Sequence, residues 1–178
     1  MAWEFLHDYQ RRRIFTFLDP ESDPLGAGYH ILQSKIALGS GGIFGKGFME
    51  GTQSQLNFLP EKQTDFAFTM YAEEFGILGG IVLLALYTLI IVQGLGVALR
   101  SRNHFGRLLA MGVTALLFLY VFINTAMVMG IVPVVGVPLP LVSYGGTAML
   151  SLMFSFGLVM SVAVHRDVRI GRQGLTGV

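Results

Sequence analysis

The chain has 178 residues, of which 53% are hydrophobic and only 13% are charged. Soluble proteins carry about 25% charged residues, so this composition indicates a membrane protein. Cysteine is absent, which excludes disulfide bonds and thiolate metal sites. The first ten residues, MAWEFLHDYQ, lack the apolar core of a signal peptide. We therefore expect no cleavable signal, and we do not expect Met1 to be the natural start of a complete membrane protein.

Residues 1–74 are predicted to form a large outer segment. The stretch WEFLHDYQRRRIFTFL, residues 3–18, combines aromatic residues with arginines and predicts a helix that lies along the membrane surface. A short helix is predicted near 29–38. The glycine-rich stretch 39–51 cannot build a core of its own, so we expect it to pack against the membrane domain.

Three transmembrane helices are predicted after this segment. Residues 75–99 contain no charge over 25 positions, and a spanning helix needs about 20 apolar residues. The next uncharged run, 108–164, is too long for one span, and the three prolines of PVVGVPLP interrupt it. The run therefore divides into helices over 108–132 and 145–164, and the fold class is an all-α polytopic membrane protein.

Basic residues predict the orientation of these helices. The loop 100–107 and the tail 165–178 each contain three arginines, whereas the loop 133–144 has no charge. We expect the two basic segments to face the cytoplasm and the loop 133–144 to face outward, together with residues 1–74. The triplet Arg11–Arg13 opposes this orientation, but long segments follow the rule poorly.

The motif GSGGIFGKG resembles a phosphate-binding P-loop only superficially. Ser40 and Gly47 stand where the P-loop pattern requires a glycine and a hydroxyl residue. A glycine-rich surface or re-entrant loop is the simpler interpretation. The other interpretation is that backbone amides and Lys46 bind a diphosphate headgroup at the membrane surface.

Asp65 is the leading candidate for chemistry. In the simpler interpretation Thr64 is the N-cap of the following helix and Asp65 is an acid in its first turn, which the helix dipole favours. In the functional interpretation Asp65 is a general base or a cation ligand at the membrane edge. On a regular helix Glu73 lies about 80° around the axis from Asp65 and can share its cavity, whereas Glu74 points away. The alternative explanation of these acids is a water-filled vestibule or a salt bridge to the outer loop.

The second and third spans offer fewer polar candidates. Asn124 lies inside the second span, where an interhelical hydrogen bond is its expected role. Ser143 and Tyr144 are expected to cap the last helix or to line a pocket. The sequence has no histidine pair at metal-ligand spacing and no Gly-x-Ser-x-Gly elbow.

Three stretches resemble the SEDS family (shape, elongation, division and sporulation proteins). They are YQRRRIFTFLDPESDPLGAGYHILQSKIALGSGG, GKGFMEGTQSQLNFLPEKQTDFAFTMYAEEFGILGG and GIVPVVGVPLPLVSYGGTAML. The sequence PVVGVPLPLVSYGG is more similar to the rod-shape (RodA) branch than to the division (FtsW) branch. The resemblance covers nearly the whole chain, but it corresponds to the last three of the family's ten transmembrane helices and the outer loop before them.

This resemblance implies a peptidoglycan glycosyltransferase of the bacterial inner membrane. Such enzymes polymerise lipid II, an undecaprenyl-diphosphate-linked disaccharide-pentapeptide, beside a class B penicillin-binding protein. The family's essential acid falls on Asp65. Gln63 stands where the family commonly has histidine, and Thr147 where it commonly has serine. Because the family's cavity also uses the absent helices, we expect this chain alone to be inactive.

The implied mechanism is glycosyl transfer at the outer face. Asp65 is expected to act as the base or to hold a divalent cation, Mg²⁺ or Mn²⁺. Lys46 and Lys62 are the candidates for the diphosphate. The remaining residues predicted to contact substrate are Gln53, Thr64, Glu73, Ser143 and Tyr144. A lipid II flippase and a non-catalytic scaffold for a transpeptidase are the alternative functions.

Overall fold

The computed structural model describes residues 13, 15–17, 19, 27–48, 50–51 and 64–167. Within these residues the main elements are four helices: α2 (Ala27–Ser40), α4 (Ala67–Arg100), α5 (His104–Val128) and α6 (Gly146–Val164). The last three are long and apolar enough to cross a membrane. They confirm the predicted all-α architecture with three membrane-spanning helices.

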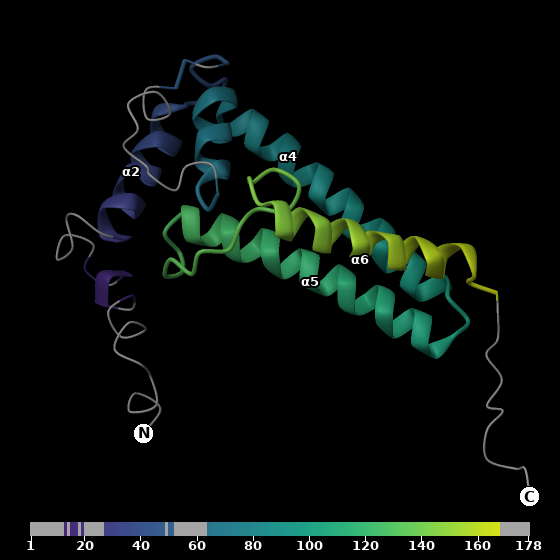
Figure 1. Cartoon of the computed structure of the whole chain (residues 1–178). Helices are drawn as coiled ribbons and strands as arrows, with labels where there is room; N and C mark the ends of the chain where they lie inside the picture. The colour runs from purple at the N-terminus through teal and green to yellow at the C-terminus, as the bar shows by residue number, and fades with distance from the viewer. Residues whose placement is uncertain are drawn as a thin grey trace, which may run out of the picture.

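The three long helices form an antiparallel bundle (Figure 1). Helix α5 packs against both α4 and α6, and α2 packs against α4 and α5. The helices approach closely where glycines replace larger residues, as is common between membrane helices. A Cβ atom on Gly94 of α4 would lie 2.4 Å from Oγ1 of Thr114 in α5, so this position has no space for a side chain.

Helix α4 is longer than the span predicted over 75–99. It begins at Ala67 and contains a kink at Gly76, whose φ of 69° and ψ of −169° are not helical. The uncharged run that predicts the span begins only after the acidic pair Glu73 and Glu74, and the helix includes both residues, of which Glu73 is buried and paired with Lys46. The part after the kink, residues 77–100, is about 36 Å long, enough to cross a hydrocarbon core of about 30 Å.

Helix α5 starts and ends earlier than the predicted 108–132. Its N-cap is Asn103, whose side chain accepts a hydrogen bond from the Phe105 amide. At the other end Gly130 has a φ of 68°, and the amides of Gly130 and Ile131 donate to the carbonyls of Met127 and Ala126. This pair of bonds is a Schellman motif, which ends the helix before the proline-rich loop.

Contacts group the loops at two ends of the bundle. At one end, called the outer end here, lie α2 and the loop 129–145 (Figure 1). The Arg13 guanidinium donates to the carbonyls of Val134 and Val135, at 3.0 and 3.1 Å. At the opposite end the Arg102 amide donates to the Arg166 carbonyl, at 3.0 Å. The loops are grouped as the arginines predict, and the side of the membrane that each end faces stays a prediction. Most of the predicted interfacial helix, 3–18, lies outside the described residues.

The buried core occupies the middle and the outer end of the bundle. It is made by α4, α5, the turn before α4 and the loop 129–145, and its members are Phe66, Phe68, Tyr87, Leu117, Val121, Met127, Val128 and Leu139. Helix α6 has no buried residue. The candidate site lies at the outer ends of α4 and α5, next to this core.

Candidate functional site at the outer end

Asp65 lies in a turn, residues 64–66, directly before α4. Its neighbour Phe66 is buried in the core and occupies the N-cap position of α4, where no side chain caps the helix. The interpretation of Thr64 as N-cap and of Asp65 as a first-turn acid is therefore wrong. The burial of Phe66 anchors the turn and leaves Asp65 half-buried at the outer end.

The loop after α5 lies against the turn that carries Asp65. Asn124 of α5 donates two hydrogen bonds through Nδ2, one to the Asp65 carbonyl at 2.9 Å and one to the Val137 carbonyl at 2.6 Å. Gly136 has a φ of 79°, and a Cβ atom there would lie 3.3 Å from Oδ2 of Asp65. The Asp65 carboxylate thus lies against the proline-rich loop. The expectation that Asn124 bonds another helix is corrected, because its partners belong to a turn and a loop.

The glycine-rich loop 41–47 is joined to the kink of α4. The amides of Lys46 and Gly47 donate to the carbonyls of Glu73 and Glu74, both at 3.1 Å. In the other direction, the amides of Ile77 and Leu78 donate to the carbonyls of Gly42 and Ile43, at 3.0 and 3.2 Å. These four bonds satisfy backbone groups that the kink removes from the helical pattern. The expectation that the glycine-rich stretch packs against the membrane domain is confirmed for this loop.

The side chains of the two segments form an ion pair. Nζ of Lys46 lies 2.8 Å from Oε1 of Glu73, and the Glu73 side chain is 0% exposed. This pair confirms the alternative in which the acid makes a salt bridge to the outer loop. The pair also bears on the predicted role of Lys46. A diphosphate would have to bind an ammonium that is already paired with the Glu73 carboxylate.

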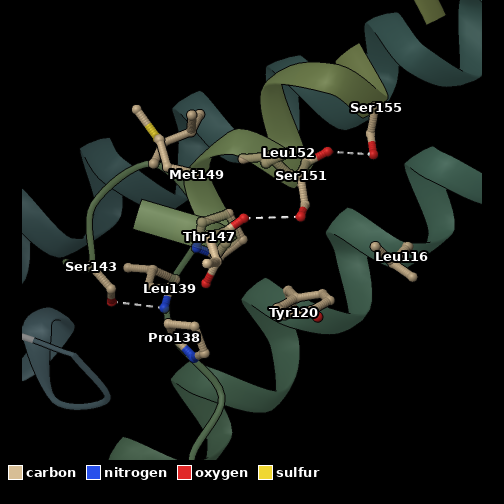
Figure 2. Close-up of a pocket in the computed structure, with 13 residues that line it drawn as sticks. Leu116, Tyr120, Pro138, Leu139, Ser143, Thr147, Met149, Ser151, Leu152 and Ser155 are labelled. Carbon is tan, nitrogen blue, oxygen red and sulfur yellow. Dashed lines mark hydrogen bonds between the residues drawn. The ribbon is translucent and has the colours of Figure 1, made fainter. Parts of the chain in front are cut away.

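Ser143 and Thr147 line a cavity of about 260 Å³ between α5, α6 and the loop that joins them (Figure 2). Oγ of Ser143 accepts a hydrogen bond from the Leu139 amide at 2.8 Å, so Ser143 closes the turn 139–143. The N-cap of α6 is Gly145, and Ser143 does not cap that helix. Along α6 the hydroxyls of Ser151 and Ser155 bond carbonyls one turn earlier, and both face the same cavity (Figure 2).

Tyr144 lines a second, larger cavity of about 840 Å³ on the other side of the same loop. The first turns of α4 form its opposite wall, with Tyr71, Glu74 and Phe75. The rings of Tyr71 and Phe75 are in contact, with centroids 4.8 Å apart. Aromatic and polar groups therefore line one groove at the outer end. Among the described residues, Asp65 belongs to the lining of neither this cavity nor the smaller one.

A divalent cation would find one protein carboxylate at Asp65. The described residues contain no group of three metal-ligating side chains. Mg²⁺ commonly keeps several waters and takes one or two carboxylates from the protein, so a contact with Asp65 alone suits that ion. The cation stays a prediction.

Sequence reasoning missed two features of this site. It assigned nothing to Gly136, although a glycine inside a proline-rich loop can signal a close approach. It also gave no role to Leu141, whose φ of 66° is unusual for a residue with a side chain. The predicted residues Gln53 and Lys62 lie outside the described part of the chain.

Comparisons with known proteins agree with the motifs. The model of the FtsW/RodA/SpoVE family, described as "Cell cycle protein", matches residues 1–168. Peptidoglycan glycosyltransferase MrdB of Escherichia coli K12 is 63% identical over 169 residues, which cover 94% of this chain and 46% of MrdB. Peptidoglycan glycosyltransferase RodA of Treponema pallidum is 44% identical, with 88% of this chain and 36% of that protein covered.

Solved structures show the same fold. A structure described as "Structural coordination of polymerization and crosslinking by a peptidoglycan synthase complex" matches with a TM-score of 0.76 and 32% identity, over 94% of this chain and 45% of that one. An aspartate-to-alanine mutant of the rod-shape-determining protein RodA of Thermus thermophilus matches with a TM-score of 0.60 and 31% identity, over 71% and 40% of the two chains. The chain spans about half the length of the relatives that it matches.

Proposed function

Because the chain belongs to the FtsW/RodA/SpoVE family of cell cycle proteins, we propose that the full-length protein is a peptidoglycan glycosyltransferase. The chain is that of a multi-pass membrane protein, with three helices long and apolar enough to span a bilayer. We place the full-length protein in the bacterial inner membrane, where it polymerises lipid II during cell elongation. Its partner in this proposal is a class B penicillin-binding protein that cross-links the strands.

The placement of Asp65 is the observation that carries the proposed chemistry. Asp65 is a half-buried carboxylate at the outer end of the bundle, held in a turn between a buried phenylalanine and the loop 133–140. A general base must lie close to the hydroxyl from which it takes the proton, and this turn presents the carboxylate at the outer end.

The transfer itself is a displacement at a sugar carbon. The hydroxyl oxygen of the acceptor sugar forms a bond to the anomeric carbon of the donor, and the bond from that carbon to the diphosphate oxygen breaks. The proton of the hydroxyl goes to the Asp65 carboxylate, and undecaprenyl diphosphate leaves with the bonding electrons. The cavity beside Tyr71 and Tyr144 offers an amphipathic surface for the substrate headgroup.

The departing diphosphate needs positive charge close by. Lys46 is the first candidate, and its ammonium also donates to Oε1 of Glu73. Lys62 is the second candidate. A divalent cation, when bound, would neutralise diphosphate charge, and Asp65 would supply one of its ligands.

The deciding experiment supplies labelled lipid II in detergent to the full-length protein with its cognate transpeptidase. We expect polymer from the wild type and none from Asp65→Asn. Asp167→Asn is the matched control, because Asp167 is an exposed carboxylate at the opposite end of the bundle and should leave polymerisation unchanged.

Three other outcomes would contradict the proposal. Polymer from a folded Asp65→Asn protein would remove Asp65 from the chemistry. No polymer from the wild type, with lipid translocation intact in vesicles, would favour a flippase. Normal growth of cells that carry Asp65→Asn, together with loss of growth when the outer loop is disrupted, would favour a scaffold.

A further inference from the structure

We propose that Asn124 is a positioning residue for the Asp65 carboxylate, which it holds at a fixed place by joining the Asp65 turn to the loop 133–140. This inference rests on the proposed function, because it assigns the position of the base in that reaction. It concerns a side chain of α5 that is 0% exposed and belongs to neither segment that it joins.

The hydrogen bonds of Asn124 define its role and its orientation. Both bonds leave Nδ2 and end on backbone carbonyls, those of Asp65 and Val137, which are 59 and 13 positions away in the sequence. Because a carbonyl accepts and never donates, only the amino side of the amide can face these two partners. A carboxylate or an aliphatic side chain of similar size cannot replace it.

The carboxylate of Asp65 is confined by the segment that Asn124 holds. Val137 follows Gly136, and Gly136 is the residue whose missing side chain makes space for Oδ2 of Asp65. Asn124 therefore fixes the Asp65 backbone, and Oδ2 of Asp65 lies next to the space that a side chain at Gly136 would fill. A shift of the loop relative to the turn would move the carboxylate relative to any bound hydroxyl.

The loop has other anchors that do not involve Asn124. Arg13 holds the carbonyls of Val134 and Val135, the Tyr87 hydroxyl donates to the Pro140 carbonyl, and Ser143 closes the following turn. Loss of the Asn124 amide should therefore release the Asp65 turn while the loop stays folded. This separates a positioning role from a role in folding.

The test is steady-state polymerisation of labelled lipid II by the full-length protein with its transpeptidase, with kcat and KM measured separately. We expect Asn124→Leu to lower kcat about 100-fold, because a misplacement of about 1 Å has this effect on a reacting group. KM for lipid II should stay at the wild-type value, because Asn124 is buried behind the turn. A purely structural residue would instead lower the yield of folded protein and leave kcat per folded molecule unchanged.

The matched control is Thr125→Val. Thr125 is the next residue of α5, it is also buried, and its hydroxyl bonds the Val121 carbonyl of its own helix at 2.5 Å. This variant removes a buried hydrogen bond from the same turn without touching Asp65. We expect a wild-type kcat.

A second variant keeps the proposal testable if Asn124→Leu does not fold. Gly136→Ala leaves Asn124 in place but puts a methyl group 3.3 Å from Oδ2 of Asp65, and it should lower kcat in the same way. Gly42→Ala controls for backbone strain, because Gly42 also has a positive φ, of 56°, and its added Cβ would meet no atom within 4 Å.

The outcomes separate this inference from the proposed function. An inactive wild type, or an active Asp65→Asn, contradicts the function itself. If the wild type polymerises and Asp65→Asn does not, a wild-type kcat in folded Asn124→Leu overturns the positioning role. In the case where Asn124→Leu is unfolded, a wild-type kcat in Gly136→Ala overturns it equally.

Discussion

Lys46 and Glu73 show how a carboxylate can be buried within a membrane-spanning helix. The Glu73 side chain is fully buried, whereas the side chain of Lys46 is 26% exposed. The two partners therefore differ in what happens when the other is removed. A buried charge that loses its counter-charge is costly, but a lysine that reaches solvent can be hydrated instead.

We expect Lys46→Met to destabilise the protein by about 3 kcal/mol, because it leaves the Glu73 carboxylate buried without the ammonium. Glu73→Gln should cost only about 1 kcal/mol, because it removes the charge from the buried side and leaves Lys46 close to water. Thermal unfolding of the purified full-length protein in detergent measures both. Equal losses of stability, or a larger loss for Glu73→Gln, would contradict the argument that the different exposure of the two side chains sets the cost of each substitution.

Residue types were easier to predict than their partners. Asp65, Glu73 and Asn124 stood out in the sequence because polar groups are rare near apolar spans. Their contacts come from segments distant in the chain: Lys46 pairs with a residue 27 positions away, and Asn124 reaches 59 positions back to Asp65. Hydrophobic periodicity and local propensity carry no information on such pairings. The salt bridge could therefore be predicted only as an alternative, and the two bonds of Asn124 could not be predicted.

Helix α4 combines two parts that meet at Gly76. The conformation of Gly76 is open only to glycine, and a Cβ atom there would lie 2.4 Å from the Gly45 amide nitrogen and 2.5 Å from the Ile43 carbonyl oxygen. The kink is therefore shaped by the neighbouring loop as well as by the glycine. Gly96 of the same helix has no such constraint, because a Cβ atom there would meet no atom within 4 Å.

Gly76→Ala should destabilise the protein strongly. Backbone strain alone is worth about 1–3 kcal/mol, and the close contacts with the loop add to it. Gly96→Ala, in the regular part of α4, should be neutral or stabilising by up to about 1 kcal/mol. Thermal unfolding in detergent compares the two variants, and a similar melting temperature for both would contradict the requirement for glycine at the kink.

The apolar runs were enough to find all three long helices, and the proline-rich motif correctly separated the second from the third. Their ends were less predictable. The uncharged run placed the start of the span at Phe75 and the capping interpretation placed the start of the helix at Thr64, whereas α4 begins at Ala67. The end of α5 depends on Gly130 and on the hydrogen bonds that the amides of Gly130 and Ile131 donate. A search for charged residues does not detect this signal.

The two ends of the bundle carry different loops. The outer end gathers α2, the Asp65 turn and the loop 133–144, whereas the opposite end holds Arg102, Arg166 and Asp167. Distribution of arginines predicts that the second group faces the cytoplasm. The chain contains no cysteine, so a single introduced cysteine can report the side of each loop.

In a cysteine-free full-length protein, Val135→Cys should react with a membrane-impermeant maleimide added to intact spheroplasts. Val135 is 51% exposed, so a thiol there is accessible to the reagent. Arg102→Cys, at the opposite end, should react only after the membrane is permeabilised. The reverse pattern would invert the orientation and place Asp65 on the cytoplasmic side.

The four backbone bonds between the loop 41–47 and the kink of α4 also limit how the length of this chain can vary. Each of the four amides has its own carbonyl acceptor in the other segment: Lys46 and Gly47 donate to the kink, and Ile77 and Leu78 donate to the loop. Insertion or deletion of one residue within either segment would displace every donor from its acceptor at once. Both segments should therefore keep a constant length among functional variants of this protein, and changes in chain length are expected to collect between them.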